Sequence, residues 1–193
     1  MRKLAILFFL TVLAIGAYAQ APIEGFWNVK LGEERNSVIN KIKQKYPNAS
    51  WNYKTYSDKQ NNNIDNASLV VGNAHLAGIK GTMTLEFSNG KLSNGTFSVG
   101  FRTEQPTYQN VQSFLQQKMQ DVNNFYDVFF TAFKEKYGEP YSTENGVLTW
   151  KSSNGNKLQI SPKYFIEELP WDAHDGYIGL NVSYLFGITV IDY

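Results

Sequence analysis

Few side chains in this 193-residue chain could carry out chemistry, because it contains two histidines and no cysteine. The lack of cysteine excludes disulfides, thiolate nucleophiles and Cys-ligated zinc. A histidine-centred catalytic group would have to use His75 or His174. His75 follows the apolar run Leu69–Val71, and we interpret it as a structural or turn residue rather than a general base.

A second candidate group lies near the C-terminal end, where Asp172 and Asp175 flank His174. Two carboxylates and an imidazole this close could bind a divalent metal through hard oxygens and a borderline nitrogen. However, no other histidine stands at ligand spacing, and Asp-Ala-His-Asp-Gly is also typical of a polar turn before a strand. We favour the turn, keep these three residues as metal candidates, and expect no cofactor.

Catalytic motifs are missing from the sequence, which has no G-x-S-x-G elbow, H-E-x-x-H, Walker loop or G-x-G-x-x-G. Glycoside hydrolysis needs two acids that face each other across a sugar. Glu167 and Glu168 are adjacent and would point apart in an extended chain, and Glu104, Glu139 and Glu144 have no partner that we can place. We therefore expect no catalytic residue and a non-enzymatic protein, with a metal-assisted hydrolase as the competing hypothesis.

Aromatic residues are abundant, with 4 tryptophans, 12 tyrosines and 13 phenylalanines. Trp51 and Tyr53 are predicted to share one face of a short strand, with Tyr56 nearby, and Trp171 to stand in a loop before the last strand. Exposed rings of this kind could stack on a sugar or anchor a protein partner. Aromatic residues in a half-buried strand also commonly close the edge of a core. These four residues form the predicted ligand-binding site, and the core-edge interpretation stays open.

Two stretches of helical periodicity would position these groups. Apolar residues recur at spacings of three and four over residues 33–46 and over Tyr108–Tyr137. Pro47 ends the first predicted helix, since the residue before a proline is disfavoured in helical conformation. Thr107 is the predicted N-cap of the second helix, and Gly138 its C-terminal stop.

The remaining apolar residues alternate, as expected of strands. Asn89-Gly90 lies between two alternating runs, which is a strong hairpin signal. On the return strand, one extra residue at Asn94-Gly95, a β-bulge, is needed to keep the following apolar residues on the core side. Leu158 and Ile160 predict a strand over Lys157–Ser161. Alternation from Ile178 to Phe186, kept in phase by Ile188 and Val190, predicts a long strand in the middle of the sheet or bending across it.

This order of elements, a helix followed by strands and then repeated, predicts an α+β fold. The expected architecture is an antiparallel β-sheet with helices packed on one face. Residues 20–193 are predicted to form a single domain with two helix-then-strands halves, about 20–105 and 106–193.

The N-terminal segment has the pattern of a secretory signal: a basic start at Arg2 and Lys3, an apolar stretch, and Ala17-Tyr18-Ala19. We expect residues 1–19 to be cleaved, since the apolar stretch is too short to span a bilayer. The mature protein would be soluble, periplasmic or secreted, with no membrane span. Loss of the two basic residues changes the net charge from +1 to −1, which argues against nucleic-acid binding.

The two halves also have similar sequence patterns. The first has Leu31-Gly32 followed by Val38 and Ile42, and the second has Tyr137-Gly138-Glu139-Pro140 at a helix end. This pattern, over most of residues 25–160, resembles small envelope domains of the SmpA/OmlA and β-lactamase-inhibitor-protein type. The chain departs from them in its long second helix and lacks the cysteines of the inhibitor proteins.

The resemblance implies a helical segment packed on an antiparallel sheet, and a non-catalytic envelope or inhibitor-like role. The expected function is therefore binding of a protein or another envelope component. A module that binds a glycan or a small ligand through exposed aromatic residues is the alternative.

Overall fold

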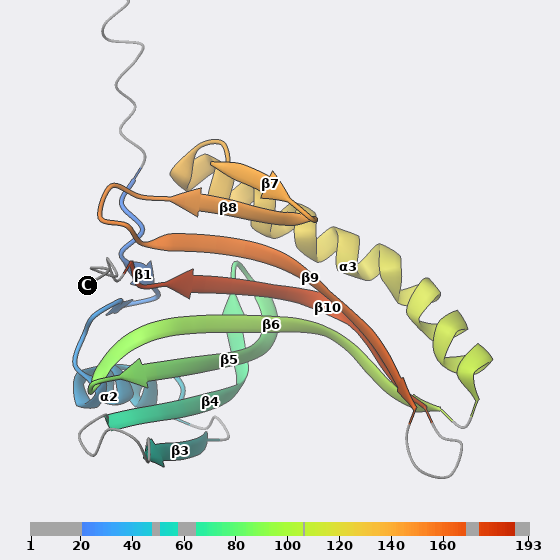
Figure 1. Ribbon diagram of the computed structural model, residues 1–193, viewed down its shortest axis with the longest axis horizontal. Coiled ribbons are helices and arrows are strands. Elements are labelled where there is room, and N and C mark those ends of the chain that lie inside the picture. The colour runs from blue at the N-terminus through green and yellow to red at the C-terminus, as the bar shows by residue number, and fades with distance from the viewer. Residues whose placement is uncertain (1–20, 48–50, 58–64, 106, 169–173, 188–193) are drawn as a thin grey trace, which may run out of the picture.

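The computed structural model describes residues 21–47, 51–57, 65–105, 107–168 and 174–187, which form two sheets and two helices (Figure 1). A large antiparallel sheet has eight strands in the order β3-β4-β5-β6-β10-β9-β8-β7. Its strands are β3 (Trp51–Ser57), β4 (Asp65–Leu76), β5 (Ile79–Ser88), β6 (Lys91–Gln105), β7 (Ser142–Glu144), β8 (Val147–Lys151), β9 (Lys157–Glu168) and β10 (His174–Leu185). A short hairpin is formed by β1 (Gly25–Phe26) and β2 (Val29–Lys30), and the helices are α2 (Arg35–Lys45) and α3 (Tyr108–Tyr137).

The chain order confirms the predicted α+β fold with two helix-then-strands halves. Helix α2 precedes the meander β3–β6, and α3 precedes the meander β7–β10. The last strands of the two halves, β6 and β10, pair antiparallel at the centre of the sheet, with Gly100 opposite Gly179. Strand β10 is therefore a long central strand, as its alternation predicted.

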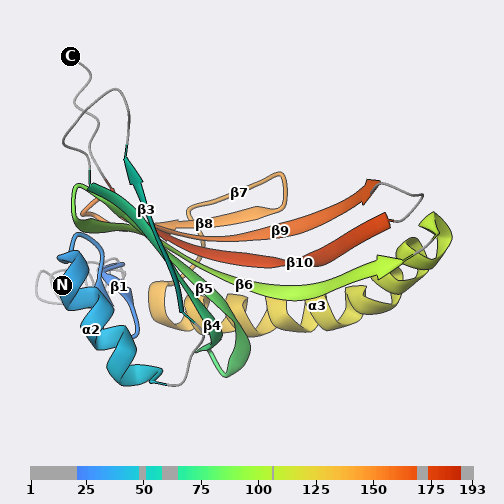
Figure 2. The ribbon, with the colours of Figure 1, turned by 90° about the horizontal axis from the view of Figure 1, so that it is seen from below.

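Both helices lie on the same face of the sheet, and no helix or strand of the described residues covers the opposite face, which we call the uncovered face (Figure 2). Alternate strand residues are buried on the helix face, among them Phe97 on β6 and Val182 on β10. Phe129 of α3 packs edge-on against Phe97 at 5.9 Å between ring centroids, and Phe133 packs against Trp150 at the same distance. Burial of these large side chains, each contributing about 2–3 kcal/mol, holds the helix layer on the sheet.

The β1–β2 hairpin also packs on the helix face. The Phe26 ring lies against Tyr184 at 5.1 Å and covers Gly95 of β6. A β-carbon at position 95 would overlap this ring, so glycine is required there for close packing.

Helix α3 begins and ends where the sequence predicted. The Thr107 side chain accepts a hydrogen bond from the Asn110 amide at 3.4 Å, and Gly138 closes the helix with a φ of 78°. Helix α2 is shorter than predicted, since Glu34 is its N-cap and it ends at Lys45. Within the described ranges, neither helix combines the length and apolar character that a membrane span requires.

The predicted hairpin between β5 and β6 is confirmed. Asn89 and Gly90 both have positive φ, 51° and 73°, as a two-residue primed turn requires. The predicted bulge is present, but the extra residue is Ser93, one position before Asn94-Gly95. The Ser93 hydroxyl donates a hydrogen bond to the Glu86 carbonyl at 3.0 Å, which stabilises the extra residue at this position.

Strand β9 is longer than predicted and β10 begins earlier than predicted, and both form an extension of the sheet with β6. In the described residues, 161–168 of β9 and 99–105 of β6 pair only with β10 (Figure 1). The prediction of a polar turn is wrong for its second half, because His174, Asp175 and Gly176 belong to β10. Ladder pairing on both sides, with an ion pair from Asp175 to Arg102 on β6, makes this segment a strand.

Candidate functional site

The uncovered face of the sheet is the candidate site, and its centre consists of small uncharged polar side chains. These residues alternate with the core residues, so they point away from the helices. All are half-buried and line up across adjacent strands in two polar rows. The first row is Thr84, Thr96, Ser183, Gln159 and Thr149, and the second row is Thr82, Ser98, Asn181 and Ser161.

Cross-strand hydrogen bonds fix the side chains of the polar rows. The hydroxyls of Thr96 and Ser183 lie 3.1 Å apart, and the Ser98 hydroxyl donates to the Asn181 amide oxygen at 2.9 Å. In the first row, the Gln159 amide donates to the Thr149 hydroxyl at 3.1 Å. The centre of the uncovered face is therefore ordered before any partner arrives.

Next to the polar rows, Gly100 and Gly179 face each other on the two central strands. A β-carbon at either position would lie 2.7 Å or 2.6 Å from the Tyr177 hydroxyl oxygen, so the phenol ring lies low across both glycines. Burial raises the pKa of the Tyr177 hydroxyl above its ordinary value, which keeps it a neutral donor.

Tyr177 belongs to what we call the aromatic–basic cluster, with Phe165 and Lys163 on β9 and Arg102 on β6. The Tyr177 and Phe165 rings stack at 5.7 Å with an interplanar angle of 12°. The Lys163 ammonium lies 5.7 Å from the Tyr177 ring centroid and 6.0 Å from that of Phe165. Such rings offer flat apolar area beside a cation, a combination common in binding surfaces.

Arg102 is held by Asp175 at the edge of this cluster. The Arg102 Nε atom donates to both carboxylate oxygens of Asp175, at 3.0 and 2.8 Å, and its Nη2 atom also contacts the carboxylate. The Asp175 side chain is 1% exposed, whereas that of Arg102 is 64% exposed. Asp175 is therefore a buried anchor that orients a surface guanidinium.

The metal candidates are only partly described. Asp172 lies outside the described residues, and of His174 only the backbone is described, paired with Gln105 and Glu168. Asp175 directs its carboxylate to Arg102 instead of an open site. In the described part of the chain, no group of three or more histidine, aspartate or glutamate side chains could hold a metal ion.

The predicted aromatic site remains a prediction. Trp51, Tyr53 and Tyr56 lie on the edge strand β3, opposite Val71, Leu69 and Asn66, and their side chains fall outside the described part. Trp171 falls outside the described residues altogether.

The backbone of His75 is fixed by two aromatic side chains. Its N–H donates to the Tyr46 hydroxyl at 3.2 Å, and its carbonyl accepts from Trp27 Nε1 at 2.9 Å. The His75 side chain is exposed. These contacts involve the backbone alone, so the interpretation of the His75 side chain as structural stays a prediction.

The sequence did not reveal the aromatic–basic cluster. The alternation of Gly179, Asn181 and Ser183 with apolar residues was visible and marked the second face of β10. Phe165 and Lys163 were missed because the strand before them was predicted to end at Ser161.

Comparisons of the chain with protein-family models, with curated proteins and with solved structures find no match.

Proposed function

We propose that this protein is an exported, non-enzymatic α+β domain that binds a protein or another envelope component through the uncovered face of its sheet. The observation that carries the proposal is the placement of both helices on one face, so that no described element lies over the central strands on the other face. The proposed export depends on the signal-like pattern of residues 1–19. The resemblance to SmpA/OmlA and β-lactamase-inhibitor proteins is part of the same proposal.

The uncovered face suits binding because its side chains are already ordered. Binding costs less free energy when the side chains of a surface are fixed beforehand, and the polar rows are tied by hydrogen bonds. At one end, the aromatic–basic cluster supplies tyrosine and arginine, two of the residue types that most often dominate binding energy.

The same face is poorly equipped for catalysis. The polar rows contain hydroxyls and amides but no histidine or carboxylate that could act as a general base. The buried carboxylate beside them, Asp175, is engaged by Arg102.

The experiment is affinity capture from a solubilised envelope fraction of the source organism, with the mature protein immobilised. Thr96→Lys places a charged side chain in the first polar row, and Gln117→Lys places the same charge on the exposed side of α3. We expect Thr96→Lys to reduce capture of the partner at least about tenfold, since like or unpaired charges in an interface cost several kcal/mol. Gln117→Lys should leave capture unchanged. Equal capture by both variants would reject the uncovered face as the binding surface.

A glycan is the second candidate ligand, and the stacked pair of Tyr177 and Phe165 favours it. Sugars pack their C–H faces on flat aromatic rings, and Arg102 and Lys163 could donate hydrogen bonds to their hydroxyls. Titration with a glycan panel would test this, comparing Tyr177→Ala with Tyr164→Ala, which removes a neighbouring exposed tyrosine of β9. Binding lost only in Tyr177→Ala would support a glycan ligand, and no binding of any glycan would remove this candidate.

A further inference from the structure

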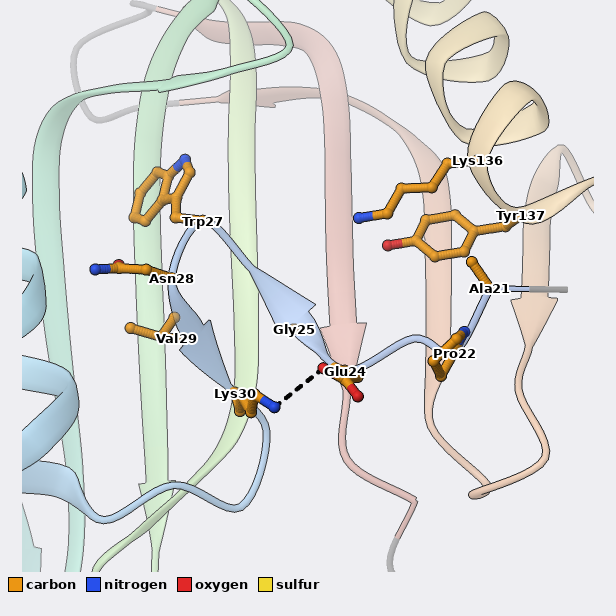
Figure 3. A pocket seen from close by; sticks show the side chains of 10 residues that line it. All are labelled: Ala21, Pro22, Glu24, Gly25, Trp27, Asn28, Val29, Lys30, Lys136 and Tyr137. Atoms are coloured by element: carbon orange, nitrogen blue, oxygen red, sulfur yellow. Dashed lines mark ion pairs between the residues drawn. The ribbon is translucent and has the colours of Figure 1, made fainter.

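A separate cavity of about 370 Å³ lies on the helix side of the molecule, between the β1–β2 hairpin and the C-terminal end of α3 (Figure 3). Its volume falls in the range of small-molecule sites. Because the β1–β2 hairpin packs on the helix face of the sheet, the cavity is separate from the uncovered face. Its walls include Trp27, Val29 and Lys30 of the hairpin and Lys136 and Tyr137 of α3.

The α3 wall presents two hydrogen-bond donors to the cavity. Tyr137 is 2% exposed, yet its hydroxyl has no hydrogen-bond partner among the described residues. Figure 3 shows this hydroxyl and the Lys136 ammonium directed toward the hairpin, and the ammonium lies 5.0 Å from the Tyr137 ring centroid. A hydroxyl that lines a cavity and makes no hydrogen bond with a described residue can donate one to a ligand held there.

The charges around these two donors leave room for an anion. Glu24, the carboxylate of the lining, is engaged by Lys30 at 3.2 Å, whereas Lys136 makes no ion pair with a described residue. At the end of α3, the carbonyl of Lys134 accepts from the Gly138 amide at 2.9 Å, and that of Gly138 accepts from Trp150 Nε1 at 2.8 Å. These carbonyls therefore do not need Lys136 as their donor.

The hairpin wall presents an apolar surface, the half-buried ring of Trp27. Its φ is 51°, a left-handed conformation that is unfavourable for a bulky side chain and persists only where surrounding contacts enforce it. Those contacts are the hydrogen bond from Nε1 to the His75 carbonyl and packing against Tyr46 at 5.0 Å and Phe26 at 5.4 Å. The indole is thus held in one orientation in the hairpin wall of the cavity.

From this geometry we infer that the cavity binds a small carboxylate with an aromatic or alicyclic body. The carboxylate accepts hydrogen bonds from the Tyr137 hydroxyl and the Lys136 ammonium. The ring of the ligand packs against Trp27. Charge-assisted hydrogen bonds of this kind select an acid over an uncharged molecule of the same shape.

The test uses matched pairs of probes: phenylacetate with phenylacetamide, and cyclohexylacetate with cyclohexylacetamide, measured by ligand-observed NMR titration of the mature protein. We expect at least one acid to bind with a Kd of about 1 mM or tighter, and its amide to bind about tenfold more weakly. Lys136→Gln and Tyr137→Phe should each weaken binding of the acid about tenfold and leave binding of the amide nearly unchanged.

Lys134→Gln is the matched control. Lys134 carries the same charge on the same last turn of α3, but it pairs with Glu139 at 2.6 Å and does not line the cavity. Equal binding of acid and amide would overturn the inference, as would no binding of any probe up to about 10 mM. Equal loss of acid binding in Lys134→Gln would overturn it too, because the effect would then be general electrostatics. None of these outcomes depends on capture of a partner by the uncovered sheet face.

Discussion

The ion pair between Arg102 and Asp175 gives a quantitative test of how the sheet extension is stabilised. Arg102→Leu would leave the Asp175 carboxylate, 1% exposed, without its charged partner. Removing one member of a buried pair typically costs 3–5 kcal/mol, and because the Arg102 side chain is 64% exposed we expect the lower end, about 3 kcal/mol. The free energy of unfolding at pH 7, measured by urea denaturation, gives this value directly.

A double-variant cycle separates the unpaired charge from lost packing. In Arg102→Leu/Asp175→Leu both charges are gone, so most of the stability lost in the single variant should return. The control is Lys91→Met, which breaks an exposed pair with Glu34 at 3.8 Å and should cost no more than about 1 kcal/mol. The reasoning is refuted if Arg102→Leu costs no more than the control, or if the double variant is no more stable than the single one.

Three further outcomes follow from the structure. Gly95→Ala should lower the free energy of unfolding, measured by the same urea denaturation, by about 2 kcal/mol because the new methyl group overlaps the Phe26 ring. The control is Gly78→Ala, which has open space around it but a φ of 80°, and it should lower the free energy of unfolding by about 1 kcal/mol. Burial alone would raise the pKa of Glu33, but hydrogen bonds from Lys41, Ser37 and the Lys30 amide outweigh it and hold the pKa below its ordinary value. The stability that Glu33 contributes is therefore complete above its unfolded-state pKa and is lost as the pH falls through the lower folded-state pKa. A Glu33→Gln variant should be less stable than wild type by up to about 1 kcal/mol at pH 7 and by less at pH 3. A stability difference that does not depend on pH would contradict this. Elemental analysis of purified protein should find less than one equivalent of divalent metal, because Asp175 is engaged by Arg102, and a stoichiometric metal would restore the hydrolase hypothesis.

The helices could be predicted closely because their signals are local. The apolar stripe, the Thr107 cap and the Gly138 stop all lie within or beside α3, and its bounds are as predicted. The predicted position of the β-bulge is one residue away from the observed one, because an extra residue at any of several neighbouring positions would return the following apolar residues to the core side. The choice of Ser93 depends on a hydrogen bond to Glu86 on the neighbouring strand, which periodicity along one strand does not contain.

The candidate site was harder to predict because it depends on which strands are neighbours. Strand β9 continues through Pro162, a residue that usually argues against a strand. Pro162 is tolerated because β8 has ended by then, with its last described pair joining Leu148 to Ile160, so that side of β9 needs no donor. Only the pairing of β9 with β10 brings Phe165 opposite Tyr177, and that pairing joins residues whose relation cannot be read from either segment alone.

The cavity was missed for a different reason. Its walls come from the β1–β2 hairpin and the end of α3, which are more than 100 residues apart in the chain. Tyr137 is the last residue of the apolar stripe of α3, and it is buried. The sequence pattern gives no information on whether its hydroxyl finds a partner.

Site-specific photocrosslinking tests the central proposal, partner binding by the uncovered sheet face, most directly. A benzophenone amino acid would replace Ser183 in the first polar row, and Gln117 on the exposed side of α3 in a matched protein. After irradiation in the intact envelope, we expect a discrete crosslinked species from position 183 and none from position 117. Crosslinking from position 117 alone would place the partner on the helix side and contradict the account.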